Sequence, residues 1–193
     1  VQHGPTRTGV VEPNPRAHPP PAGPVPPYHG AMTHEPRLTQ ALRALLSTQR
    51  VAALGTLDAD GLPFVSMVPF AVEPASARLV VHVSGLAAHT RNLQASPRVS
   101  LLVMQAEVAG EPVHALPRVT LEGDAAVLVR DSAEWTQARD AYLARFADAQ
   151  PMTGLGDFMF VAIAVQGARQ VAGFGAARSL DAQTVAEVLR PPR

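Results

Sequence analysis

The chain has 193 residues and a hydrophobic fraction of 47%, which fits one globular domain. Its formal net charge is zero. This charge argues against nucleic acids and anionic membrane surfaces as partners, because they bind clustered positive charge. Cysteine is absent, so disulfides, iron–sulfur clusters, thiolate metal sites and cysteine nucleophiles are excluded. All 16 Lys-or-Arg residues are arginine, which also excludes a Schiff-base lysine and a P-loop lysine.

The chain opens on a proline-rich segment, because nine of the 19 prolines fall within residues 1–27. Such a segment buries little and favours extended conformations, so we predict a disordered tail at residues 1–30 and a single domain at residues 31–193. No apolar core of a signal peptide stands at the start, and no run approaches the ~20 apolar residues that span a membrane. We therefore expect a cytoplasmic protein with no membrane partner.

A helix is predicted from about His34 to Arg50, with Thr33 as a candidate cap, because apolar residues recur on one helical face. These residues are Leu38, Ala41, Leu42, Leu45 and Leu46. The pattern then becomes β, and the segments VAALGTLD and LPFVSMVPFAVE flank a hairpin signal at residues 58–61. ARLVVHVS and RVSLLVMQ are predicted as the next two strands, and PRVTLEGDAAVLV as a fifth strand with a bulge at Gly123.

In the second half, Asp131 followed three residues later by Glu134 marks a helix start. The buried stripe expected on this helix consists of Trp135, Ala138, Tyr142, Leu143 and Phe146. FMFVAIAVQ and ARQVAGFG are predicted to form a last hairpin, and a short helix near Asp181 to Leu189 closes the chain. Strands joined mostly by hairpins, with few helices, predict a mainly β fold with peripheral helices, built as a closed antiparallel barrel.

Cations and hydroxyls stand beside a core strand in HTRNLQASPRVSLLV, residues 89–103. We expect a short helix to begin near Ala87, where unpaired N–H groups and the helix dipole favour negative charge. His89, Thr90 and Arg91 fall in its first turn, and Ser84 stands just before it. This pattern predicts a phosphate cradle; the alternative is a surface connector with a solvated Arg91.

The segment VSMVPF holds a second candidate for ligand binding. Pro69 inside a strand must lie at an edge or a bulge, because it cannot donate a ladder hydrogen bond. The backbone of Ser66, Met67 and Val68 would then face a flat heteroaromatic ligand. The alternative is a plain edge strand.

The sequence contains no pattern typical of three other classes of site. GFGAAR at residues 173–178 lacks the third glycine of a dinucleotide fingerprint. His82, His89 and His114 have neither helical spacing nor acidic companions, so no metal site is predicted. No G-x-S-x-G nucleophile elbow occurs. No catalytic residue is assigned, and a bound cofactor is expected to supply the reactivity.

Three stretches, LGTLDADGLPFVSMVPF, LVVHVSGLAAHTRNLQASPRVSLLV and LPRVTLEGDAAVL, follow one another along the chain. Together they resemble the FMN-binding split-barrel superfamily, whose best-known member is pyridoxamine 5′-phosphate oxidase. VAGFGAAR is similar to the haem-utilisation branch, which adds a small C-terminal domain. Only 15 residues follow Arg178, so we do not expect that domain here. The resemblance covers about residues 36–178 and implies an antiparallel split β-barrel that forms a homodimer.

The resemblance also implies FMN in each of two clefts between the subunits. The family's basic phosphate pair falls on Ala88 and His89, so half of it is missing, and Thr90 and Arg91 are expected to substitute. Arg118 falls where a polar side chain approaches the flavin. Together with the residues along the ring, the expected cofactor-binding residues are Ser66, Met67, Val68, Pro69, His82, Ser84, His89, Thr90, Arg91 and Arg118.

We therefore expect an FMN-binding oxidoreductase of unassigned substrate, in which flavin exchanges electrons with a small-molecule substrate or electron donor. The alternative is a haem-binding or haem-degrading protein of the same fold. A third class is a non-catalytic adaptor that keeps the fold and the dimer but has lost flavin. Flavin absorbs in two broad near-UV and blue bands, whereas haem has a Soret band, so the colour of the purified protein separates these classes.

Overall fold

The computed structural model describes residues 36–192, so the tail predicted at residues 1–30 lies outside the described part. In chain order its elements are α1 (Arg37–Thr48), β1 (Val51–Leu57), β2 (Pro63–Glu73), β3 (Arg78–Ser84), α2 (Ala88–Ala95), β4 (Arg98–Met104), the 3-10 turn η1 (Val113–Ala115), β5 (Arg118–Val127), α3 (Ala133–Arg145), the 3-10 segment η2 (Ala147–Gly154), β6 (Phe158–Val171), β7 (Ala177–Asp181) and α4 (Ala182–Leu189).

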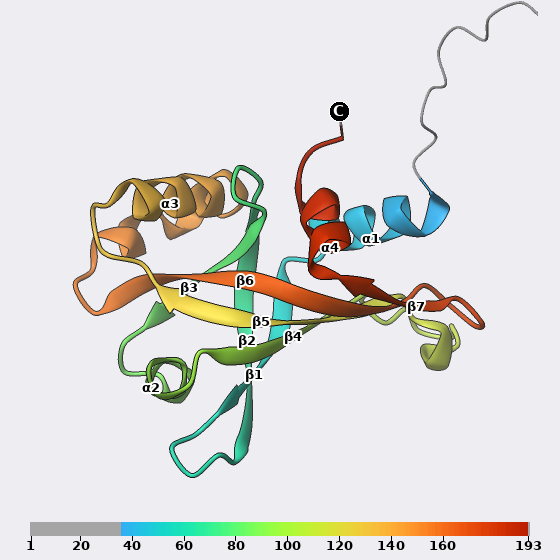
Figure 1. The fold of residues 1–193 in the computed structure, drawn as a ribbon, viewed down its shortest axis with the longest axis horizontal. Coiled ribbons are helices and arrows are strands. Elements are labelled where there is room, and N and C mark those ends of the chain that lie inside the picture. Colours follow the sequence, from blue (N-terminus) through green and yellow to red (C-terminus); the bar gives the residue numbers. More distant parts are fainter. Residues whose placement is uncertain (1–35, 193) are drawn as a thin grey trace, which may run out of the picture. The chain divides into compact units, whose positions relative to one another are not determined.

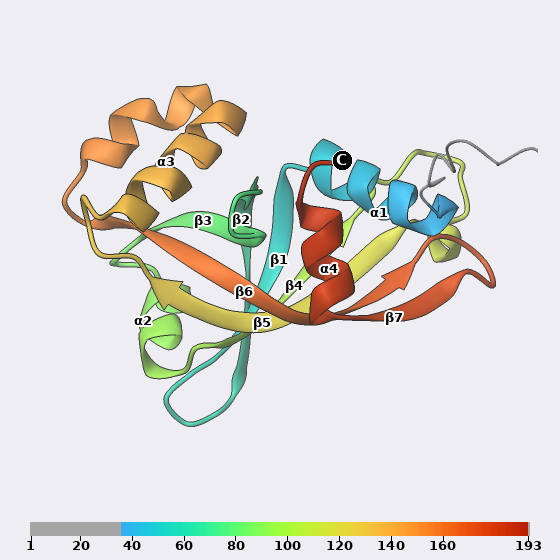
Figure 2. The same cartoon turned by 45° about the horizontal axis from the view of Figure 1, so that its top comes forward.

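All strand pairs are antiparallel, in the order β3-β2-β1-β4-β5-β6-β7. β3 also pairs with β6, and this pairing closes six strands into a barrel. Figures 1 and 2 show β7 extending from the barrel beside β6, with the helices around the outside. The predicted class, a mainly β antiparallel split barrel with peripheral helices, is confirmed.

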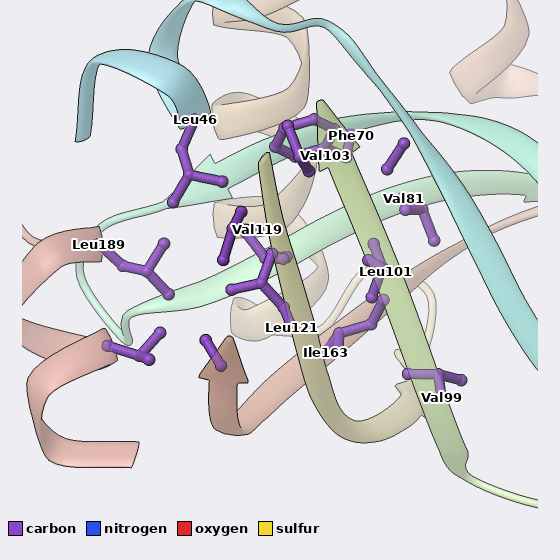
Figure 3. Packing of buried hydrophobic residues seen from close by; sticks show 14 of the residues in the cluster. Leu46, Phe70, Val81, Val99, Leu101, Val103, Val119, Leu121, Ile163 and Leu189 are labelled. Atoms are coloured by element: carbon purple, nitrogen blue, oxygen red, sulfur yellow. The ribbon is translucent and has the colours of Figure 1, made fainter. Parts of the chain in front are cut away.

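The barrel core follows from the alternation of side chains along each strand. In β4, Val99, Leu101 and Val103 are buried, whereas the residues between them are more exposed. Figure 3 shows these side chains packed with residues of the other strands, and with Leu46 of α1 and Leu189 of α4. Each such buried side chain contributes roughly 1.5–3 kcal/mol, so the strands form a firm support for surface groups.

The bulge predicted at Gly123 is confirmed. The register between β5 and β6 shifts between Glu122 and Gly123. A Cβ atom at position 123 would lie 2.4 Å from the carbonyl oxygen of Ala164. Only glycine permits this approach of the two backbones without a shift.

The prediction for the last hairpin places its turn at the wrong residues. β6 runs unbroken from Phe158 to Val171, through Gly167, and pairs there with both β5 and β7. The chain turns instead at residues 172–176, where Gly173 and Gly175 have φ angles of 129° and 70°. Such angles suit glycine, so the two glycines that were expected in a strand form the turn.

Helix starts also differ from the predictions. α1 begins at Arg37 with Pro36 in the cap position, later than expected, and the candidate cap Thr33 lies outside the described residues. α3 is capped by Ser132, whose Oγ accepts a hydrogen bond from the Trp135 backbone N–H at 3.1 Å. Asp131, the expected start, has a φ angle of 63°, so it turns the chain into the helix rather than capping it.

α3 covers the outer face of β3 and the first half of β6 with a second apolar cluster. Trp135, Ala138 and Tyr142 of the expected stripe are buried there, together with Phe160 of β6. Leu143 is partly buried against the same cluster, and Phe146 is buried just past the end of the helix, so the stripe prediction is confirmed for the three residues within α3. Within residues 36–192, no helix is long and apolar enough to cross a membrane.

Candidate functional site

The first half of β2 lies at a strand edge. Residues Pro63–Pro69 pair with β1, whereas pairing with β3 begins only at Phe70. Pro69 therefore stands where the second neighbour begins, as its missing N–H predicts. The edge leaves Met67 65% exposed and Val65 66% exposed.

Ser66 on this edge meets His89 in the first turn of α2. The Ser66 Oγ lies 3.0 Å from the His89 Nδ1, at hydrogen-bond distance. The imidazole is half-buried, and desolvation lowers its pKa below the usual value. Loss of hydration favours the uncharged ring, so His89 presents a neutral imidazole whose Nδ1 is already engaged.

The start of α2 is fastened to the end of β3. The Thr90 hydroxyl donates to the Ser84 carbonyl at 2.6 Å, and the Ser84 Oγ accepts from the Leu86 N–H at 3.2 Å. The same Ser84 hydroxyl donates to Asp157 Oδ2 at 3.3 Å. Arg91 is exposed and donates from Nη1 to the Leu86 carbonyl at 3.1 Å. The guanidinium of Arg91 is thus oriented by a hydrogen bond but still faces solvent.

Three of the expected site residues have side chains that are buried in the protein interior. Val68 is 2% exposed in the barrel core, and Thr90 is fully buried. His82 is 8% exposed, with its ring 4.3 Å from the Phe160 ring and 5.7 Å from the Tyr142 ring between centroids. A ligand at this surface would meet the backbone of these residues and not their side chains.

Arg118 lies far from the other expected site residues. It pairs with Val171 at the end of β6, whereas Ser84 pairs with Phe158 at the beginning. The 14 residues of β6 correspond to roughly 40 Å of extended strand, and Figures 1 and 2 place α2 and β7 at opposite ends. Arg118 donates to the Leu116 carbonyl at 3.0 Å, beside η1. One small ligand cannot reach both ends in one chain.

An exposed apolar face links these regions across the outside of β2, β1 and β4. A groove of about 400 Å³ there is lined by Val51, Ala52, Ala53, Val65, Ser66, Met67, Leu102 and Met104. Sequence reasoning missed this face. A signal was available, because FVSMV and LLVM place apolar residues on both faces of a strand, whereas a strand with one solvated face alternates.

Within residues 36–192, no group of three or more His, Asp or Glu side chains is placed to hold a metal ion. The described imidazoles stand apart, on β3, α2 and η1.

A six-stranded antiparallel barrel with peripheral helices is the architecture of the split-barrel class. The chain belongs to the pyridoxamine 5′-phosphate oxidase family, which its residues 38–172 match. The resemblance proposed from the sequence motifs is thereby confirmed.

The relatives point toward haem. The chain is 31% identical to the haem oxygenase HutZ of Vibrio cholerae over 142 residues, 73% of this chain and 80% of HutZ. It is 36% identical to a chloroplast haem oxygenase, HOZ, of Arabidopsis thaliana over 141 residues, 72% of this chain but 41% of that protein. A haem-binding protein from Mycobacterium smegmatis has a similar structure, with a TM-score of 0.71, 30% identity and coverage of 79% of this chain and 61% of that one.

These names correct the function first expected from the sequence. The family match is compatible with FMN, but the relatives are named for haem. An FMN-binding oxidoreductase is therefore not supported, and the haem-binding alternative fits better. Two of these relatives are much longer than the matched segment, so their full activities are not assigned to this chain.

Proposed function

We propose that this protein binds haem at the α2 end of the barrel and belongs functionally with haem-degrading proteins. The observation that carries the proposal is the chemistry of the surface there. Ser66 lines an apolar groove at the β2 edge, and its Oγ lies 3.0 Å from the half-buried imidazole of His89. Arg91, two residues further along α2, presents an exposed guanidinium. Haem is a broad apolar ring with carboxylates at one edge, and it matches that combination.

The residues at this end can be matched to parts of haem. Leu86, which is 80% exposed just before α2, offers apolar surface to a porphyrin, and Arg91 can pair with a propionate. Bound haem would supply the iron chemistry on which its own oxidative cleavage depends. The chain's contribution is to cover the ring, exclude water from it and orient it. Electrons would come from an external donor.

The proposal includes a homodimer. Arg118 and the η1 turn lie at the far end of β6 from His89. The family resemblance nevertheless implies that residues at both ends contact the same ligand. A second copy that packs across the exposed apolar face would bring its Arg118 toward the first copy's α2. The face would then be buried, which accounts for large apolar side chains in contact with water. The cytoplasmic location also remains part of this proposal.

Titration of the full chain with haem, and separately with FMN, tests the proposal. We expect a Soret band that shifts and saturates with haem, and flavin fluorescence that stays unquenched with FMN. Saturable quenching of FMN without a shifted Soret band would instead support the flavoprotein hypothesis. Binding of neither ligand would favour the non-catalytic adaptor.

A further inference from the structure

We infer that the cleft between α1, α3, α4 and the end of β2 binds a small organic acid, whose carboxylate meets Arg145 and whose apolar body lies against the walls. The cleft has a volume of about 420 Å³, within the ~300–1,000 Å³ that is usual for small-molecule sites. Figures 1 and 2 show the end of β2 between α3 on one side and α1 with α4 on the other. The cleft meets β2 at Ala71 and Val72, beyond the open edge at residues 63–69, so it is separate from the proposed haem site.

The lining of the cleft combines apolar walls with positive charge. Most of the lining residues are apolar, and all four elements contribute to them, for example Leu46, Val72, Ala144 and Leu189. The exceptions are Ser47 and three arginines, Arg43, Arg145 and Arg190. No Asp or Glu of residues 36–192 lines the cleft. An apolar pocket with a few convergent polar groups is the usual form of a small-molecule site, and here the charge of those groups selects an anion.

Arg145 is held in a fixed orientation at this cleft. Its Nη1 donates to the Leu46 carbonyl and its Nη2 to the Ser47 carbonyl, both at 3.0 Å. Nη2 also donates to the carbonyl of Gln49, the residue that caps α1. The guanidinium carbon lies over the Phe70 ring, 5.1 Å from its centroid. A bound anion would therefore meet a cation that is already in position, which reduces the conformational entropy lost on binding.

The charge of Arg145 has no counter-ion within residues 36–192. Its Nε is buried without a hydrogen-bond partner, and its other nitrogens donate to carbonyls and not to carboxylates. Burial lowers the pKa of Arg145, and the positive charge of Arg50 lowers it further, although arginine stays charged at neutral pH. A desolvated cation without a counter-ion is costly. A carboxylate in the cleft would reduce this cost, because its oxygens accept charge-assisted hydrogen bonds from a guanidinium.

The alternative is that the arginines of the cleft only cap helices. Arg43 donates to carbonyls at the end of α4, that of Glu187 at 3.2 Å and that of Val188, as Arg145 does at the end of α1. A capping role alone predicts that no ligand binds. The apolar walls also decide between anions, because inorganic phosphate would gain nothing from them, whereas a hydrocarbon body would be removed from water.

Calorimetric titration of the full chain with octanoate, and with 1-octanol as its uncharged match, tests the inference. We expect saturable octanoate binding with a Kd of about 1 mM or lower, and about tenfold weaker binding of 1-octanol. Arg145→Gln should weaken octanoate by roughly ten- to a hundredfold, to the level of 1-octanol or below. Arg169→Gln, at an exposed arginine on β6 outside the cleft, is the matched control and should behave as wild type.

Ala144→Trp tests the same site without a change to any arginine. Ala144 is exposed on α3 and lines the cleft, so the larger side chain should fill the space and abolish octanoate binding. Circular dichroism checks that each variant is folded, and if Arg145→Gln does not fold, Ala144→Trp decides. The inference is overturned if the wild type shows no saturable octanoate binding or binds 1-octanol as tightly. Octanoate affinity that survives in Ala144→Trp would also overturn it, because the acid would then bind elsewhere.

Discussion

His82 is a histidine that the fold keeps neutral. Its ring is buried among aromatic rings beneath α3, and desolvation, aided by the charge of Arg130, lowers its pKa to about 4. In the unfolded chain the pKa would be about 6.5. Between these two values the unfolded state binds more protons, so the folded state loses stability as the pH falls from 6.5 to 4.

We expect His82→Phe to resist acid better than the wild type. The histidine costs up to about 3 kcal/mol at pH 4, and phenylalanine removes the titrating group while it keeps a ring in the cluster. Urea unfolding at pH 7.5 and pH 4.5 measures the loss for each protein, and the variant's loss should be smaller by about 2 kcal/mol. His114→Ala, at an exposed site, is the control. Equal losses in His82→Phe and wild type would show that another group governs acid stability.

Arg91 should contribute affinity through the carboxylates of haem. A charged hydrogen bond is worth about 1.5–3 kcal/mol, which corresponds to roughly ten- to a hundredfold in affinity. Arg91→Ala should weaken haem by that factor and leave the binding of haem dimethyl ester nearly unchanged. Absorbance titrations with the two ligands measure the contrast. Equal weakening of both would mean that Arg91 supports the turn, through its bond to the Leu86 carbonyl, and not the ligand.

Sequence reasoning singled out residues of β2 and α2 that the structure brings together, but not the direction of each side chain. A proline within a strand and cations at a helix start are local signals, so Pro69 and Arg91 could be singled out. The Thr90 side chain was expected to bind a phosphate, yet it is fully buried. Which face of β2 or α2 turns inward is decided when the barrel closes, and no local pattern contains that information.

The bulge in β5 depends on a missing side chain. A Cβ atom at position 123 would lie 2.4 Å from a backbone oxygen, so Gly123→Ala must push β5 and β6 apart. We expect a loss of about 2 kcal/mol or more in unfolding free energy. Gly55→Ala is the matched control on β1, because its Cβ would meet only ordinary contacts at 3.5 Å or more. Chemical denaturation of both variants measures the difference, and equal stabilities would contradict this reading of the bulge.

Elements were predictable where their signals are local. The Asp58 turn has the expected form, with the Asp58 carboxylate accepting from the Leu62 N–H at 2.8 Å. The last hairpin was not predictable, because Gly167 and Gly173 are equally good turn signals in sequence. Long-range pairing decided between them. β6 continues through Gly167 because it can pair with β5 on one side and β7 on the other.

At the scale of the whole molecule, we expect the exposed apolar face of β2, β1 and β4 to be buried against a second copy of the chain. Leu102, 37% exposed, lies on β4 within that face. Leu102→Glu places a charge that a buried interface cannot accommodate without a partner, so we expect the variant to be a monomer at micromolar concentration and to bind haem weakly. Light scattering measures the mass. Val129→Glu, at an exposed residue outside the groove, is the control and should behave as wild type.

The central claim is that haem binds to a dimer whose two copies share each site. Sedimentation velocity of the haem-loaded full chain, followed at the Soret wavelength, tests it most directly. We expect all bound Soret absorbance to sediment as one species with the mass of two chains. Soret absorbance that sediments with a single chain, or a dimer that sediments without Soret absorbance in the presence of excess haem, would contradict the claim.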